Sequence, residues 1–251
     1  MLKFICVLMI LFISHGFCEE KNNAVIPVPK LENDFYDWYK RHETVKKYIK
    51  EHPADLVFIG DSITHMFGGT PQSEKPFGHE VWKKYYSHRN AVNMGFGWDR
   101  TQNVLWRLNN GEFDNITPKV AVLLIGTNNL TGTKNARTNT PQEIFEGIQK
   151  VCMTIHEKSP KTKIIALSVL PRSPQRFVEP IRQINAKLQE LEKEDYITIL
   201  NLTEQFAEAD GLPKKSLMRD SVHPGIEGYK IWAAKLEPVL SKLLNDKMVT
   251  P

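Results

Sequence analysis

The stretch Leu56-Val57-Phe58-Ile59-Gly60-Asp61-Ser62-Ile63-Thr64 decides the fold. It opens with a short apolar run that ends at Gly60, a pattern typical of a buried β-strand. Gly60 allows the backbone to turn sharply where the strand ends. Ser62 then lies at the carboxyl end of the strand and beside the start of a helix, where ligands bind in open α/β sheets. Since backbone N–H groups at a helix start can stabilise an anion, Ser62 is a candidate nucleophile whose own N–H helps to hold an oxyanion.

The same residues have a simpler interpretation. Asp61-Ser62 directly after a strand also fits an ordinary helix N-cap, because short polar side chains accept hydrogen bonds from the first turn of a helix. The stretch alone leaves both interpretations open, and the rest of the chain has to decide between them.

Length and composition predict one globular domain. The chain has 251 residues, of which 41% are hydrophobic and 25% charged, and this balance suits a single α/β domain. The formal net charge is +4, and the charged residues are interspersed along the chain. Because no polybasic cluster occurs, we expect no nucleic-acid partner.

The N-terminus has the features of a secretory signal peptide, which we place at residues 1–18. Lys3 supplies the positive charge, residues 4–13 form the apolar core, and Cys18 ends the segment. The apolar run is too short for a transmembrane span. A lipoprotein signal with an acylated Cys18 is disfavoured, because Phe17 stands where such a signal has a small residue. The sequence therefore predicts a secreted or periplasmic protein.

The mature chain, residues 19–251, reads as one domain. Residues 19–54 form an N-terminal arm and helix, with a loose arm up to residue 32, and 55–246 form the main domain. Outside the signal peptide the only cysteine is Cys152, so no intramolecular disulfide is predicted.

Strand and helix patterns alternate along the chain. Apolar runs predict strands at 55–60, 91–94, 120–125, 164–170 and 197–200. Helical spacing predicts helices at 33–51, 81–87, 100–109, after the capping box at 140–143, at 178–193 and at 226–244. This alternation predicts a three-layer α/β/α sandwich with a five-stranded parallel sheet.

Polar residues follow three of the predicted strands: Ser62, the Trp98-Asp99 turn and Asn128. The carboxyl ends of parallel strands lie side by side at one edge of the sheet. Just before the last helix, Asp220 and His223 are three residues apart, so the carboxylate can accept from one imidazole nitrogen and leave the other free as a base. The Asn128 amide can donate to an oxyanion. Together these residues predict covalent catalysis by a serine.

These motifs resemble those of a known superfamily. Gly60-Asp61-Ser62, Gly95-x-Gly97 with Asp99, Gly126-x-Asn128 and Asp220-x-x-His223 are similar to the four sequence blocks of the SGNH (GDSL) hydrolases, over roughly residues 55–243. Val104-Leu105-Trp106-Arg107-Leu108 and Leu170-Pro171-Arg172 further resemble the catalytic subunits of platelet-activating-factor acetylhydrolase and their bacterial relatives. The resemblance implies a flavodoxin-like fold and hydrolysis of small acyl groups without a metal or another cofactor.

The resemblance also implies a role for each matching residue. Ser62 would be the nucleophile, His223 the base and Asp220 the group that orients it. The N–H of Ser62, the N–H of Trp98 and the side chain of Asn128 would form the oxyanion hole.

Trp98 departs from the family pattern, which usually has Gly there. We expect its indole to project near the acyl pocket and restrict the acyl group; the alternative is that it packs outward on the next helix. Gly97 and Arg100 are further candidates for the cleft, and for Arg100 a helix-surface position is equally compatible with the sequence. His65, His79 and His88 follow no metal-ligand spacing, so we predict no metal site.

Three functions are compatible with these observations. The first is a secreted serine esterase acting on small O-acyl groups, above all acetyl, on carbohydrates or glycans. The second is a lipid esterase of the lysophospholipase or platelet-activating-factor acetylhydrolase type. The third is an inactive hydrolase fold that binds glycans, which the intact Ser62, Asn128, Asp220 and His223 disfavour. The partner would be a small-molecule or glycan ester, and homodimerisation is left open.

Overall fold

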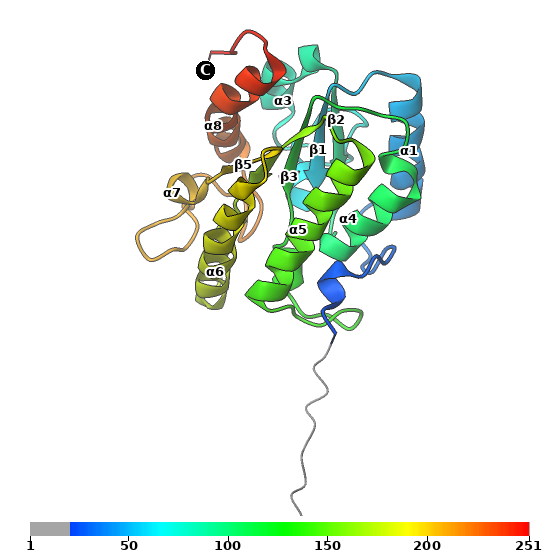
Figure 1. Cartoon of the computed structure of the whole chain (residues 1–251). Coiled ribbons are helices and arrows are strands. Elements are labelled where there is room, and N and C mark those ends of the chain that lie inside the picture. The colour runs from blue at the N-terminus through cyan, green and yellow to red at the C-terminus, as the bar shows by residue number, and fades with distance from the viewer. Residues whose placement is uncertain (1–20, 251) are drawn as a thin grey trace, which may run out of the picture.

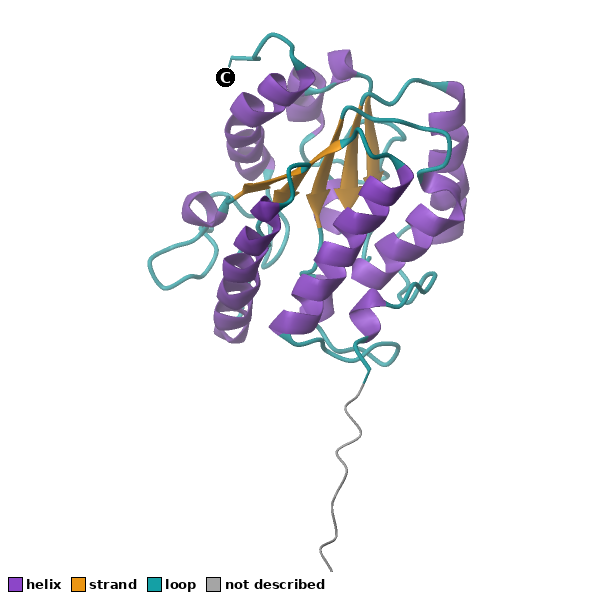
Figure 2. Ribbon diagram, viewed as in Figure 1, coloured by secondary structure: helices purple, strands orange, loops and turns teal. Residues whose placement is uncertain are grey.

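A computed structural model describes residues 21–250 and confirms the predicted α/β/α sandwich (Figures 1 and 2). All five strands are parallel, in the order β2-β1-β3-β4-β5. The strands are β1 (Leu56–Gly60), β2 (Ala91–Gly95), β3 (Val120–Leu124), β4 (Lys163–Leu167) and β5 (Ile197–Leu200). In the register, Gly60 lies opposite both Gly95 and Leu124, so β2, β1 and β3 end at the same level. The loops that follow them therefore meet at one edge.

Helices connect the strands along the chain and cover both faces of the sheet. The α-helices are α1 (Trp38–Glu51), α2 (Ser62–His65), α3 (His79–Tyr85), α4 (Thr101–Arg107), α5 (Pro141–Lys158), α6 (Val178–Leu188), α7 (Thr203–Phe206) and α8 (Ile226–Leu244). Short helical turns are η1 (Asn23–Val25), η2 (Ser87–Arg89), η3 (Leu108–Glu112), η4 (Asn128–Leu130), η5 (Gln175–Phe177) and η6 (Gln189–Lys193).

The core has two halves, one on each face of the sheet. Side chains alternate along a strand, so Val57 and Ile59 of β1 pack under α1, α4, α5 and α6. Leu56 and Phe58 face the other way and pack with α3 and α8. Because both faces are covered, β1 and β3 are apolar throughout, as buried parallel strands require.

The predicted capping box starts α5 as expected. The Thr140 hydroxyl accepts from the N–H of Glu143 at 3.2 Å, and the Glu143 carboxylate accepts from the N–H of Thr140 at 2.8 Å. Two N–H groups of the helix start are thereby satisfied, and Pro141 occupies the first helical position, where no N–H is needed.

The predicted start of the first helix was wrong. Asn33 was expected near the helix start, but α1 starts at Trp38, because the side chain of Asp37 accepts from the N–H of Lys40 and caps it. Residues 34–36 remain outside the helix and pack against the loop after β2, a contact that local spacing does not reveal.

The expectation of a loose arm was also wrong. The Val28 N–H donates to the Gln102 carbonyl at 3.2 Å, and the Asn103 side chain donates to the Pro29 carbonyl at 2.7 Å. Figure 1 shows this part of the chain, in blue, beside the starts of α4 and α5. The predicted signal peptide, residues 1–18, lies outside the described residues. Within residues 21–250 no helix is long and apolar enough to cross a membrane.

Candidate active site

Ser62 and His223 meet at the edge of the sheet, as the sequence predicts. Ser62 is the first residue of α2, directly after the sharp exit from β1, and it is 7% exposed. Its Oγ lies 2.9 Å from Nε2 of His223. A hydroxyl and an imidazole at this distance can exchange a proton, which is the requirement for activating a serine.

Asp220 lies on the other side of the same imidazole. Its two carboxylate oxygens are 3.0 and 2.9 Å from Nδ1 of His223. Partial burial raises the pKa of the Asp220 carboxyl. Hydrogen bonds from the N–H groups of His223 and Val222, together with the imidazole, lower this pKa by a larger amount, so it lies below its usual value. An ionised carboxylate beside Nδ1 favours the tautomer with its hydrogen there and leaves Nε2 free to accept from Ser62.

Asn128 and Trp98 follow β3 and β2, the two strands that flank the strand before Ser62. Asn128 starts η4 after β3, and its side-chain nitrogen donates to the Asp99 carbonyl at 3.0 Å. An amide nitrogen carries two hydrogens, so one donor remains. The Ser62 N–H is at the start of a helix and has no partner within it. The Asn128 amide and the Ser62 N–H therefore each keep a hydrogen-bond donor that the fold itself does not use.

The backbone at Trp98 adopts a conformation that favours glycine. Trp98 has φ 64°, in the left-handed region that glycine adopts without strain and other residues rarely adopt. Its indole is 37% exposed. Its position relative to a bound acyl group remains a prediction.

Gly97 packs closely against Asp34 and Tyr36, so a side chain at this position would displace the Asp34 carboxylate. A Cβ on Gly97 would lie 1.9 Å from Oδ2 of Asp34, and the Tyr36 hydroxyl donates to the Gly97 carbonyl at 3.1 Å. Asp34 is a residue that the sequence analysis missed. Its half-buried carboxyl has a raised pKa, chiefly because of burial, while the nearby imidazole of His223 acts in the opposite direction.

Arg100 neither lines a cleft nor lies on a helix surface, so both interpretations of it were wrong. Its side chain is fully buried. The guanidinium donates to the carbonyls of Asn128 at 2.7 Å and Thr131 at 2.9 Å. Arg100 therefore stabilises the backbone segment that carries the Asn128 amide.

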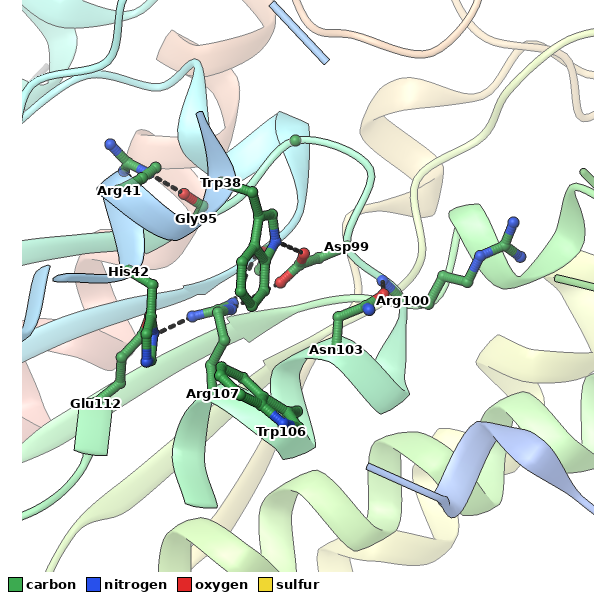
Figure 3. A network of polar contacts seen from close by, with 12 residues as sticks. Trp38, Arg41, His42, Gly95, Asp99, Arg100, Asn103, Trp106, Arg107 and Glu112 are labelled. Atoms are coloured by element: carbon green, nitrogen blue, oxygen red, sulfur yellow. Dashed lines mark hydrogen bonds and ion pairs between the residues drawn. The ribbon is translucent and has the colours of Figure 1, made fainter. Parts of the chain in front are cut away.

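A buried polar network behind the Trp98 turn was also missed. Asp99 accepts from Nε1 of Trp38 and from Nε of Arg107, each at 2.7 Å. Arg107 also pairs with Glu112, which lies 2.7 Å from Nδ1 of His42. Figure 3 shows Arg107 between the two acidic side chains, with Trp38 reaching Asp99 from α1. Burial raises the pKa of Asp99 to about 6, although Arg107 and Trp38 lower it.

Asp61, next to the candidate nucleophile, is both a cap and a buried acid. Oδ1 accepts from the Ile63 N–H at 2.9 Å, so the N-cap interpretation of Asp61 was correct and coexists with the position of Ser62. Oδ2 is buried without a hydrogen-bond partner among residues 21–250. Burial raises the pKa of Asp61 to about 7.

The histidines named in the sequence analysis do not form a metal site in the described part of the chain. Among residues 21–250, no group of three or more His, Cys, Asp or Glu side chains is arranged to hold a metal ion. His65 is buried in the core beside Tyr36, with the ring centroids 4.6 Å apart.

Comparison with known proteins identifies the family. A family model described as GDSL-like lipase/acylhydrolase matches residues 58–231. The alpha2 subunit of platelet-activating factor acetylhydrolase IB from Homo sapiens is 32% identical over 233 residues, which cover 90% of this chain and 94% of that protein. The alpha1 subunit from Bos taurus is 29% identical over 225 residues, covering 88% and 89%.

Solved structures share the fold. A GDSL-like lipase from Bacteroides thetaiotaomicron superposes with a TM-score of 0.64 at 22% identity, covering 81% of this chain and 97% of that one. A carbohydrate esterase family 3 protein from Talaromyces cellulolyticus gives a TM-score of 0.53 at 16% identity, covering 77% and 99%. The chain therefore belongs to the GDSL-like lipase/acylhydrolase family, within the SGNH hydrolase superfamily.

Proposed function

We propose that this acylhydrolase is a secreted serine esterase that removes small O-acyl groups, above all acetyl, from carbohydrates or glycans. The observation that carries the proposed chemistry is the chain of contacts from Ser62 through His223 to Asp220, with 2.9 Å between Oγ and Nε2. This chain of contacts supports one role for each side chain: Ser62 as nucleophile, His223 as base and Asp220 as orienting carboxylate.

The proposed reaction has two halves. Nε2 of His223 takes the proton of Ser62 as Oγ attacks the acyl carbon, and the carbonyl oxygen becomes an oxyanion. The ester C–O bond then breaks, and the imidazolium gives its proton to the departing alcohol, which leaves an acyl-enzyme. Water then attacks the acyl carbon with His223 again as base, the bond between Oγ and the acyl carbon breaks, and the imidazolium returns its proton to Oγ as the carboxylic acid leaves.

The oxyanion would be held by the N–H groups of Ser62 and Trp98 and by the free hydrogen of the Asn128 amide. Such donors stabilise charge that exists only during the reaction, so they raise the rate without strengthening substrate binding equally. The distance of 3.0 Å from Asn128 Nδ2 to the Asp99 carbonyl supports this role, because it fixes the amide on one side.

The substrate class is inferred from two observations. The curated relatives are named acetylhydrolases, which supports a short acyl group. The predicted signal peptide supports a substrate met outside the cell, where acylated glycans occur. The name platelet-activating factor acetylhydrolase equally supports a second candidate, hydrolysis of an acetylated lipid.

The test compares acyl length first and leaving group second. We expect the purified mature chain to hydrolyse p-nitrophenyl acetate faster than the butyrate and hexanoate, and Ser62→Ala to abolish this activity. Acetate release is then measured from an acetylated oligosaccharide and from platelet-activating factor at equal acetyl concentration. Preference for the lipid would favour the second candidate, and an inactive wild-type chain would favour a glycan-binding module.

Secretion is tested separately. Expression of the full chain in a host with a secretory pathway should release a protein whose N-terminus, read by mass spectrometry, follows Cys18. A protein retained in the cell with residues 1–18 attached would contradict the proposed localisation.

A further inference from the structure

We propose that Tyr36 and Trp38, at the entry to α1, are positioning residues for the oxyanion hole. The inference rests on the proposed serine mechanism and adds two groups that touch neither substrate nor nucleophile. They act on the turn formed by residues 95–99, which carries the Trp98 N–H.

The two side chains hold this turn on both sides of Trp98. The Tyr36 hydroxyl donates to the Gly97 carbonyl at 3.1 Å, and Nε1 of Trp38 donates to Oδ1 of Asp99 at 2.7 Å. Both rings are buried. One turn of α1 further on, Nε of Arg41 donates to the Gly95 carbonyl at 2.8 Å (Figure 3). Residues 36–41 thus contact the turn at three points: before, at and after the peptide that carries the Trp98 N–H.

The conformation of Trp98 makes such support necessary. A left-handed backbone is unfavourable for a residue with a Cβ, and it persists only where the surroundings impose it. The turn has one backbone hydrogen bond of its own, from the Asp99 N–H to the Phe96 carbonyl at 3.2 Å. Tyr36 and Trp38 supply further restraints, so the direction of the Trp98 N–H depends on them.

The same contacts reach the second proposed donor. The Asp99 carbonyl accepts from the Asn128 amide at 3.0 Å, so a shift of Asp99 moves that amide as well. Trp38 holds Asp99 on one side and Arg107 holds it on the other, through a guanidinium that is itself paired with Glu112. Removing the Trp38 donor therefore disturbs two oxyanion donors together.

The test uses two conservative variants, Tyr36→Phe and Trp38→Phe, which keep a ring and remove the donor. Removing a whole oxyanion donor costs about 100- to 1000-fold in kcat, so displacing donors should cost less, about tenfold in each variant. We expect KM for p-nitrophenyl acetate to change less than about twofold, because the contacts matter when the oxyanion forms. Tyr48→Phe is the matched control: Tyr48 lies on α1, and the variant loses a hydroxyl that contacts Thr70 at 3.1 Å, outside the turn. Its kcat should stay unchanged.

A double-mutant cycle separates positioning from general loosening of the fold. In an Asn128→Ala background one of the two affected donors is gone, so Trp38→Phe should cost clearly less than in the wild type. Unchanged kcat in both single variants, a rise in KM alone, or full additivity with Asn128→Ala would overturn the proposal. If Trp38→Phe fails to fold by circular dichroism, Tyr36→Phe carries the test. Normal activity of Ser62→Ala would instead refute the serine mechanism itself, so the two failures are distinguishable.

Discussion

Replacement of Asp61 by Asn should change how the stability of the protein depends on pH. Burial raises the pKa of Asp61 to about 7 in the folded chain, against an ordinary value of 3.8. Between these values the unfolded chain has lost the proton and the folded chain keeps it, so the free energy of unfolding falls as the pH rises. At about 1.4 kcal/mol per pKa unit, the whole shift corresponds to about 4 kcal/mol, of which about 3 kcal/mol falls between pH 5 and pH 8.

The amide introduced by Asp61→Asn keeps an oxygen that accepts from the Ile63 N–H, but it does not titrate. The free energy of unfolding of the variant therefore does not fall with rising pH on account of residue 61. The assay is urea unfolding of wild type and Asp61→Asn at pH 5, 6, 7 and 8. The stability of the variant relative to wild type should rise by about 3 kcal/mol across the series. Asp55→Asn is the control: hydrogen bonding to Asn90 lowers the pKa of Asp55, so it stays ionised throughout this range and its variant should run parallel to wild type. Parallel curves for Asp61→Asn would refute the reasoning.

Three further outcomes are expected. If the Trp98 indole restricts the acyl pocket, Trp98→Gly should raise kcat/KM for butyryl relative to acetyl esters tenfold or more, whereas unchanged ratios would place the indole elsewhere. Asp220→Asn should lower kcat by about three to four orders of magnitude, because the tautomer of His223 is no longer fixed; near-normal turnover would count against the triad. Treatment with EDTA should leave ester hydrolysis intact, and a loss that a divalent ion restores would contradict metal-free chemistry.

The layers of the fold could be predicted because they depend on local patterns. Continuous apolar runs such as residues 120–125 identify buried parallel strands, and the capping box at Thr140 fixes the start of α5 from neighbouring residues alone. The packing of residues 34–36 before α1 and the packing of the arm could not be predicted this way. Both depend on contacts with residues 95–103, which are distant in sequence.

The residues of the candidate site also fall into those with a local sequence signal and those without one. Ser62, Asn128, Asp220 and His223 were predicted because each belongs to a short motif at a strand end or before a helix. The Trp38–Asp99 contact joins residues 61 positions apart and leaves no local signal. For Arg100 the sequence showed a basic residue at a helix start, where exposure is usual; its burial follows from two carbonyls that only the folded loops present.

The central claim is that Ser62 is a covalent nucleophile activated by His223, and intact-protein and peptide mass spectrometry test it most directly. A fluorophosphonate probe should add one adduct, located on Ser62, to the wild-type protein. His223→Ala should slow this labelling strongly, and Ser62→Ala should abolish it together with esterase activity. An adduct on another residue, or an active Ser62→Ala variant, would contradict the account.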